Sequence, residues 1–350
     1  MLTDIKFSII IAAYNNTDTI RRCLDSVYNQ TYKNYEVILV DDCSPNVTYD
    51  YLKEFYDKIK IIRLPVNKGA GVARQTGLDN ASGDLVLFID QDDELFSEES
   101  LSEVIELYTQ FPDAKMIRFA FIKFYNNKWI NVHDLDIRPL HGLVFNMNFI
   151  KENNIRFHES LRMYEDTYFY LINKFIIHHK YPSVDNALLI SPDVIYKYYE
   201  YDNSITLRVY GDYSFFEYSL YNLVEMCTFI YDNFSNIIDK DDIQDLLVLP
   251  IIYAAFMYYI TCMYTDTSSS VIERKRFRAA FCCTNILSIL AKDFNIDNIQ
   301  KLQEKIDARF STEAVGNIRI PEICESYHAN IRSSLNNVYE IYTDYINNRK

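Results

Sequence analysis

The stretch Leu85-Val86-Leu87-Phe88-Ile89-Asp90-Gln91-Asp92-Asp93-Glu94 decides how we interpret the chain. Its five apolar residues in a row are typical of a strand that is buried on both faces of a parallel sheet. Four acids then crowd into five positions where that strand ends, and open α/β sheets bind ligands at this end of their strands. Because neighbouring carboxylates repel one another, the acids indicate a cation such as Mg²⁺ or Mn²⁺, which takes oxygen ligands and bridges carboxylates to phosphates. The alternative is a solvated turn that caps a helix beginning near Ser97.

The composition is that of a globular protein. Hydrophobic residues make up 49% of the 350 residues, with only 7 glycines and 8 prolines, so one large domain or two ordinary ones are expected. The formal net charge of -14 cannot neutralise phosphates broadly, and we therefore expect no nucleic acid as a partner. The 7 cysteines form no CxxC pair, which favours free thiols in a reducing compartment. Since residues 1–13 lack the pattern of a signal peptide, a cytoplasmic location is expected.

Strands and helices alternate through the first part of the chain. The β-rich runs are residues 7–12, 35–40, 59–64 and 85–89, and the helical patterns among them include 18–29 and 72–80. This order predicts βαβ units around a parallel sheet. Polar residues follow three of the strands, at 13–15, 41–42 and 90–93, and we expect these loops to face one site. The turn Gly69-Ala70-Gly71 lacks the third glycine of GxGxxG and follows the third strand, so we exclude a dinucleotide site of the Rossmann type.

Four motifs in order resemble the glycosyltransferase family 2 domain of GT-A fold. They are Ser-Ile-Ile-Ile-Ala-Ala-Tyr-Asn at 8–15, Val-Asp-Asp-Cys-Ser at 40–44, Asn-Lys-Gly at 67–69 with Ala-Arg-Gln at 73–75, and Phe-Ile-Asp-Gln-Asp-Asp at 88–93. The family's usual proline before the tyrosine is replaced by Ala12 or Ala13, and its Asp-Asp-Gly-Ser reads Asp-Asp-Cys-Ser. The resemblance implies an α/β fold with a mixed, largely parallel sheet and flanking helices.

The resemblance also implies how a nucleotide-sugar donor is held. The donor residues would be Ala12, Ala13, Tyr14 and Asn15 around the nucleoside, Asp41 and Asp42 near the base, Arg74 near the diphosphate, and Asp90 with its neighbour Gln91 near the ribose. Asp42 would accept a hydrogen bond from the base, which favours uracil. Asp92 and Asp93 would hold the Mn²⁺ or Mg²⁺ ion that bridges the diphosphate. The alternatives are a turn residue for Asp41 and a surface ion pair for Arg74.

A second acidic motif, Glu165-Asp166, resembles the Glu-Asp motif that opens a helix beneath the acceptor in the same family. An inverting sugar transfer needs a base to take the proton of the acceptor hydroxyl, and we expect Asp166 in this role with Glu165 as its neighbour and substitute. The alternative is an acidic pair that complements the helix dipole. Further along, residues 196–206 resemble the Tyr-rich segment that forms a flexible lid over the donor in this family.

The last part of the chain has a different pattern. Long apolar-periodic segments predict an all-α C-terminal region, which gives two domains at residues 1–210 and 211–350. We interpret the apolar run at 246–264 as a buried bundle helix, because Pro250 interrupts it and its tyrosine hydroxyls need partners. The alternative is insertion into a membrane, since the run is about long enough to cross a bilayer. The only dense basic cluster consists of Arg274, Lys275, Arg276 and Arg278. It is either a solvated helix face or a peripheral contact with anionic lipids on the inner face of the plasma membrane. The same region is expected to bind the acceptor or to form a homodimer.

These observations favour an inverting, metal-dependent glycosyltransferase. It would move a sugar from a UDP-sugar to a hydroxyl of a cell-surface glycan or of a lipid-linked acceptor. The alternative is a non-catalytic nucleotide-sugar-binding protein that kept the fold, and it predicts UDP binding without turnover. A nucleotidyltransferase is disfavoured because no glycine-rich loop with Lys or Arg follows the first strand.

Overall fold

The computed structural model describes residues 4–15, 19–45, 52, 55, 58–125, 127–132, 140–159, 161–162, 165–200, 314–315 and 318–319. The chain divides into two compact units, Met1–Ser204 and Ile205–Lys350. The domain boundary expected near residue 210 stays a prediction. Every helix within the described ranges is too short or too polar to cross a bilayer.

Most predictions for the second unit lie outside the described residues. These include its helices, the apolar run at 246–264, the basic cluster at 274–278 and the homodimer. The described part of this unit is an antiparallel ladder of β10 (Ala314–Val315) and β11 (Ile318–Arg319). The prediction of a helical region had not included this ladder.

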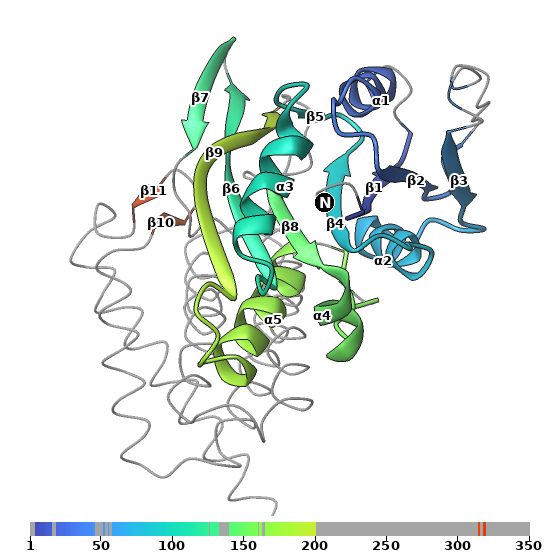
Figure 1. Cartoon of the computed structure of the whole chain (residues 1–350). Coiled ribbons are helices and arrows are strands. Elements are labelled where there is room, and N and C mark those ends of the chain that lie inside the picture. The colour runs from blue at the N-terminus through green and yellow to red at the C-terminus, as the bar shows by residue number, and fades with distance from the viewer. Residues whose placement is uncertain are drawn as a thin grey trace, which may run out of the picture. The chain divides into compact units, whose positions relative to one another are not determined.

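Four parallel strands with two helices form what we call the parallel half of the first unit (Figure 1). They are β1 (Phe7–Ala13), β2 (Tyr35–Asp41), β3 (Ile59–Arg63) and β4 (Leu85–Asp90), with α1 (Ile20–Tyr28) and α2 (Ala70–Asp79). The strand order β3-β2-β1-β4 places β1 between β2 and β4, and all three pairings are parallel. The predicted arrangement of βαβ units is therefore confirmed.

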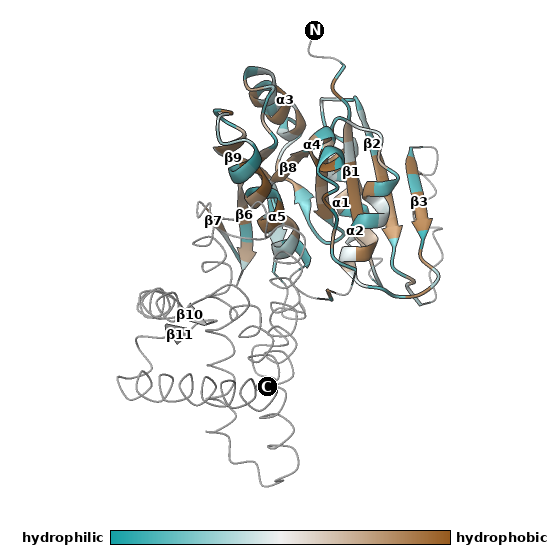
Figure 2. Ribbon diagram, turned by 90° about the horizontal axis from the view of Figure 1, so that it is seen from below, coloured by the Kyte–Doolittle hydropathy of each residue, from teal (hydrophilic) through white to brown (hydrophobic). Residues whose placement is uncertain are grey.

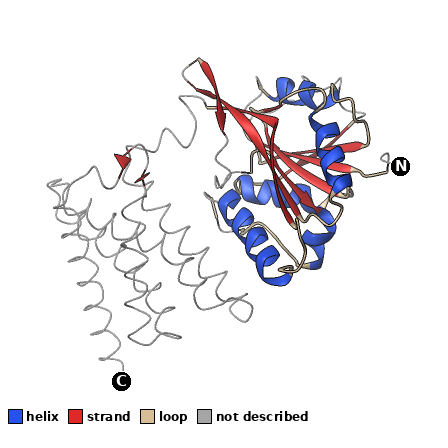
Figure 3. Cartoon of the chain, turned by 60° about the vertical axis from the view of Figure 1, so that its left-hand side comes forward, coloured by secondary structure: helices blue, strands red, loops and turns tan. Residues whose placement is uncertain are grey.

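Side-chain alternation along β1 decides which helix covers each face of the sheet. Ile9 and Ile11 join the buried cluster that contains the apolar side of α1. Ile10 points the other way, and a Cβ at Gly77 of α2 would lie only 2.4 Å from its Cγ2 atom. Only glycine permits this approach of helix and strand. Helices thus cover both faces of the sheet (Figure 3), whose strands are coloured mainly as hydrophobic in Figure 2.

The other strands and helices of the first unit form what we call the mixed half. They are β5 (Glu94–Leu95), β6 (Met116–Tyr125), β7 (Lys128–Val132), β8 (Leu143–Asn146) and β9 (Leu188–Tyr199), with α3 (Ser100–Gln110), α4 (Met147–Glu152) and α5 (Glu165–Lys180). Strand β8 pairs antiparallel with β4 and β6 and so joins the two halves into one sheet. Strands β6 and β7 form an antiparallel hairpin. The sequence did not predict β5, β8 or α4.

The first part of the predicted lid is a strand in this protein. Residues 196–199 are the last four of β9, and they pair with β6 on one side and, at Tyr196 and Lys197, with β5 on the other. Tyr196 is completely buried. Aromatic residues have a high β propensity, and two neighbouring strands satisfy this backbone, so the prediction of a flexible lid is wrong for these residues. Residues 201–206 lie outside the described part.

A cluster of aromatic side chains connects the two halves where α5 packs against β4. Phe88 of β4 meets Phe157 and Phe169 edge to face, with ring centroids 5.3 and 5.7 Å away. Phe157 and Phe169 stack on each other with centroids 4.1 Å apart. This buried packing holds α5 against β4, and so fixes the start of α5 relative to the acidic loop.

Candidate active site

The ends of β1, β2 and β4 lie side by side. In the register of the sheet, Ala12 pairs with Val40 on one side and with Asp90 on the other, while Ala13 pairs with Asp41. The two alanines therefore lie between the acids of the neighbouring strands. Their small side chains keep this edge of the sheet open, at the position where α/β sheets bind ligands.

A glutamine clamps the loop that follows β1. The Gln91 side chain accepts a hydrogen bond from the Tyr14 amide at 3.1 Å and donates one to the Tyr14 carbonyl at 2.9 Å. Asn15 has a left-handed backbone with φ of 49°, and its amide donates to the Ser44 hydroxyl at 2.8 Å. The loop backbone is fixed while Tyr14 remains 46% exposed, so its aromatic side chain can contact a flat ligand.

Asp41 and Asp42 are both buried and both engaged by turns. Asp41 accepts hydrogen bonds from the amide and the hydroxyl of Ser44. Asp42 accepts bonds from the amides of Lys68 at 2.6 Å and Gly69 at 2.7 Å, one on each carboxylate oxygen. Asp42 therefore shapes the turn at 67–69 that the sequence singled out. Its contact with a base stays a prediction.

Arg74 connects acids of the two halves. Its Nη2 atom lies 2.6 Å from Asp90 Oδ1, and its Nη1 atom lies 2.8 Å from Glu165 Oε1. The residue is 7% exposed, so it forms a buried bridge rather than the surface ion pair considered from the sequence. Burial acts to raise the pKa of Asp90, but Arg74 and His141 outweigh it and hold that pKa well below its ordinary value.

Glu165 and Asp166 open α5, as the sequence predicted. Helix α2 comes so close that a Cβ at Gly71 would lie 3.0 Å from the Glu165 side chain. Burial, followed by the charge of Asp166, raises the pKa of Glu165 to about 7, although Arg74 acts in the opposite direction. Asp166 accepts a hydrogen bond from the Thr167 amide at 2.7 Å and has no ion pair among the described residues. Glu165 is thus held in an ion pair with Arg74, whereas Asp166 can still accept hydrogen bonds from a ligand.

Asp93 is the most buried acid of the loop after β4. Its Oδ2 atom accepts from the Tyr196 hydroxyl at 2.8 Å, and its Oδ1 atom accepts from the Tyr199 amide at 2.9 Å. Burial, then the charges of Asp90 and Asp92, raise the pKa of Asp93 well above its ordinary value. Burial and Asp90 also raise the pKa of Asp92, to about 6. A cation in this loop would favour the charged form of both acids.

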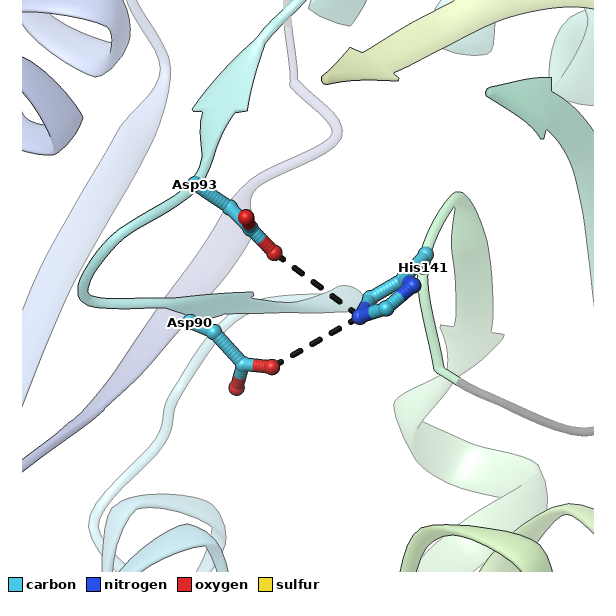
Figure 4. Close-up of side chains that lie close together, drawn as sticks. All are labelled: Asp90, Asp93 and His141. Carbon is cyan, nitrogen blue, oxygen red and sulfur yellow. Dashed lines mark ion pairs between the residues drawn. The ribbon is translucent and has the colours of Figure 1, made fainter. Parts of the chain in front are cut away.

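His141, which sequence reasoning missed, completes the cluster (Figure 4). Its Nε2 atom lies 3.6 Å from Asp90 Oδ2 and 3.7 Å from Asp93 Oδ2. One ligand atom from each of the three lies within 4.8 Å of the others. Its Nδ1 atom is buried and has no hydrogen-bond partner among the described residues. Two carboxylates and an imidazole suit a divalent ion such as Mn²⁺, and these residues fit one. Asp92, predicted as a ligand together with Asp93, is not a member of this group.

Elements far apart in the chain hold His141 in place. Arg118 of β6 donates from Nη1 to the His141 carbonyl at 2.8 Å. Gly142 has a left-handed φ of 68°, and a Cβ there would lie 2.8 Å from the Phe119 carbonyl oxygen. The Tyr198 ring of β9 stacks on the imidazole with centroids 4.4 Å apart. The sequence His141-Gly142 reveals none of these contacts. Only Gly142 hinted at a special backbone conformation at this position.

Comparison with known proteins agrees with this geometry. Residues 8–175 match the family described as Glycosyl transferase family 2. The resemblance to this family that the sequence motifs indicated is therefore confirmed for these residues. The match runs from β1 into α5, and so it includes the three strand ends, Arg74 and the Glu165-Asp166 pair.

Two curated relatives are bacterial transferases. The "Poly(ribitol-phosphate) beta-glucosyltransferase" of Bacillus spizizenii is 30% identical over an alignment of 184 residues, which covers 47% of this chain and 28% of that protein. The "UDP-Glc:alpha-D-GlcNAc-diphosphoundecaprenol beta-1,3-glucosyltransferase WfaP" of Escherichia coli is 35% identical over 122 residues, 35% of this chain and 47% of that protein. The chain therefore covers less than half the length of either relative.

A solved structure shares the fold. TarS 1-349 of S. aureus, in complex with UDP-GlcNAc, superposes with a TM-score of 0.61 at 18% identity, covering 87% of this chain and 92% of that one. The predicted α/β fold of GT-A type is confirmed.

Proposed function

We propose that this protein is an inverting glycosyltransferase that moves a sugar from a UDP-sugar to a hydroxyl of a cell-surface glycan or a lipid-linked acceptor. The family 2 domain supports the reaction class. The names of the two relatives support the substrates, since they state a UDP-linked donor, a diphosphoundecaprenol acceptor and poly(ribitol-phosphate). TarS, which has the same fold, was solved with UDP-GlcNAc.

The chain of contacts Asp90–Arg74–Glu165 carries the proposal. One buried guanidinium connects the acid at the end of β4 with the first residue of α5, through contacts of 2.6 and 2.8 Å. Asp166, the next residue along, is therefore held at a fixed position relative to the donor loop. Fixed positions of donor and base are what a displacement at one carbon atom requires. An acidic cluster that served only solubility would need no such connection.

The donor would lie across the ends of β1, β2 and β4. The exposed Tyr14 ring would pack along the uracil, beside the small Ala12 and Ala13. Asp42 would fix the turn at 67–69 under the nucleotide through its two amide bonds. Arg74 would act mainly by orienting Asp90.

Asp90, Asp93 and His141 would hold a Mn²⁺ or Mg²⁺ ion, with Asp92 next to them in the same loop. When bound, the ion would offset negative charge that develops on the departing diphosphate. The hydrogen bonds from Tyr196 and Tyr199 keep the Asp93 carboxylate in one orientation. The carboxylate would therefore lose little conformational entropy when it binds the ion.

Asp166 would act as the base. It would take the proton of the acceptor hydroxyl while the acceptor oxygen bonds to C1 of the sugar and the bond from C1 to the diphosphate breaks, which releases UDP. The names of both relatives specify beta products, and a beta product from an alpha-linked UDP-sugar requires inversion. Because Arg74 engages Glu165, Glu165 would position α5 rather than accept the proton.

Asp166→Asn tests the proposal. UDP release would be followed with a panel of UDP-sugars and with glycan and undecaprenyl-diphosphate acceptors, and UDP-sugar binding would be measured by calorimetry with Mn²⁺. We expect transfer to fall by about 10²–10⁴-fold while the affinity for the UDP-sugar stays within about threefold. Asp185→Asn, at an exposed acid of the same half, is the matched control. Full transfer by the Asp166 variant would refute its role as the base. UDP binding without any transfer by the unaltered protein would favour the non-catalytic alternative.

A further inference from the structure

A hollow of about 740 Å³ opens on the mixed half, where side chains from α3, β6, β7 and β9 meet. Its size is within the range of sites for small organic ligands. The residues that line it include none of those assigned to the donor, the cation or the base. The hollow therefore needs an explanation of its own.

A β-bulge shapes one wall of the hollow. Along the pairing of β6 with β9, Phe119 pairs with Ser191, but the next residue, Ala120, pairs with Val194. The two residues between them on β9 have no partner on β6, and Asp193 is one of these. The Ser191 hydroxyl donates to the Asp193 carboxylate at 2.8 Å and so holds the displaced acid in one orientation. Bulges of this kind re-aim side chains and are common near functional sites.

Two aromatic side chains of the hollow remain partly exposed. Trp129 of β7 is 45% exposed, and its ring is supported from behind by Phe124 and Tyr199, with centroids 5.0 and 5.2 Å away. Phe96, just after β5, is 38% exposed. Rings that are fixed by packing and still open to solvent offer flat apolar platforms at little entropic cost. The C–H face of a pyranose ring is a suitable ligand for such a platform.

Polar groups line the hollow beside the rings. Glu103 of α3, Asp193, Asn131 of β7 and Lys197 of β9 all contribute to the lining. Glu103 and Asp193 line the same hollow, and burial, followed by the charge of Asp193, raises the pKa of Glu103. Carboxylates accept hydrogen bonds from sugar hydroxyls and an amide can both accept and donate them, whereas two acids repel phosphate. The chemistry favours a neutral, hydroxyl-rich ligand.

We propose that this hollow binds sugar units of a neutral glycan chain, away from the hydroxyl that receives the new sugar. This inference rests on the proposed glycosyltransferase function and adds a subsite for the acceptor chain. The same residues of β9 contact both the hollow and the acidic loop after β4. Tyr199 packs against Trp129 and donates its amide to Asp93, while Lys197 lies 3.8 Å from Glu94. A glycan held here would be anchored to the same rigid frame as the donor.

The chain's only tryptophan makes the test direct, because its fluorescence reports on the hollow. The full chain would be titrated, without any donor, with cellotetraose and with tetra-N-acetylchitotetraose, and glucose would serve as the short ligand. We expect a saturable change in tryptophan emission with at least one tetrasaccharide, at lower concentrations than with glucose. Calorimetry should give about tenfold weaker binding for Trp129→Ala and for Asp193→Asn. Trp129→Phe, which keeps a ring, should bind within about threefold of the unaltered protein.

Ile190→Ala is the matched control, since Ile190 is an exposed apolar residue of the same strand outside the hollow. It should leave binding unchanged. Circular dichroism would verify that each variant folds. Three results would overturn the proposal: no saturable response to either tetrasaccharide, competition of the tetrasaccharide with UDP, or dimers in sedimentation that Trp129→Ala dissociates. The last result would assign this surface to contact between copies of the chain.

The subsite and the proposed function can fail separately. Saccharide binding is measured without a donor, so it can persist in a protein that transfers no sugar. In an active protein, we expect Trp129→Ala to raise the KM for a long acceptor about tenfold, with little change in kcat or in the KM for a short one. An equal effect on long and short acceptors would contradict the subsite.

Discussion

The parallel half and the mixed half are connected by two arginine links along α2, and these links differ mainly in burial. Arg74 reaches Asp90 and Glu165 with its side chain only 8% exposed. Arg156 of the mixed half forms a fork with Asp79 of α2, at 3.0 and 2.9 Å, with both side chains about half exposed. Charges out of water interact strongly and cannot be left unpaired, whereas water screens exposed ones. We therefore expect the two links to differ greatly in what their loss costs.

The largest effect is expected for Arg74→Ala. It would leave the carboxylates of Asp90 and Glu165 without their shared cation, and removing one partner of a buried ion pair typically costs about 3–5 kcal/mol. Urea denaturation would measure the free energy of unfolding, and UDP release would report the loss of transfer. Arg74→Lys is the control, because lysine keeps the charge without the fork that contacts two acids at once. A loss of stability below about 1 kcal/mol in the alanine variant would show that the halves do not depend on this bridge.

The next effect concerns pH. The pKa of Glu165 rises from 4.5 in its ordinary state to about 7 in the folded protein, so between these values the folded state binds a proton that the unfolded state has lost. The contribution of Glu165 to stability is then full below pH 4.5 and falls as the pH rises to about 7, by at most about 3 kcal/mol. Glu165→Gln should remove this part of the decline in urea denaturation at pH 5 and pH 8. Glu152→Gln, at an exposed acid of α4, should retain it. Identical pH profiles for the Glu165 variant and the unaltered protein would contradict the raised pKa.

The two halves also differ in how far the sequence predicts them. In the parallel half, β1, β2 and β4 each contain a run of four or five apolar residues followed by a polar turn, and β3 is short but rich in isoleucine. Local pattern therefore sufficed for these four strands and for the acids that follow β2 and β4. In the mixed half, β5 has two residues and β8 has four, which is too short for any periodicity, and both exist because distant strands pair with them. His141 was missed for the same reason: its neighbours come from β6 and β9. The Glu165-Asp166 pair could be predicted only because a family motif marks it.

His141 therefore offers a test of the part that the sequence did not reveal. We expect His141→Ala to weaken Mn²⁺ binding about 10–100-fold, measured as free Mn²⁺ by electron paramagnetic resonance in the absence of nucleotide. Mg²⁺ prefers oxygen ligands, so its binding should change less. His178→Ala, at an exposed histidine of α5, is the control and should have no effect. Unchanged Mn²⁺ affinity in the His141 variant would leave Asp92 and Asp93, the ligands predicted from the sequence, as the better assignment.

The smallest effect is expected for Arg156→Gln, which removes the exposed link. The fork to Asp79 has good geometry and, like the Arg74 bridge, joins α2 to the mixed half, yet about half of each side chain is exposed. Exposed ion pairs contribute about 0.2–1 kcal/mol, and salt weakens them. We expect urea denaturation to show a loss in this range at low ionic strength and almost none at high ionic strength, with transfer unaffected. A loss of stability close to that of Arg74→Ala would contradict this expectation. It would mean that the connection between the halves, and not the burial of the charges, determines how much free energy of unfolding is lost.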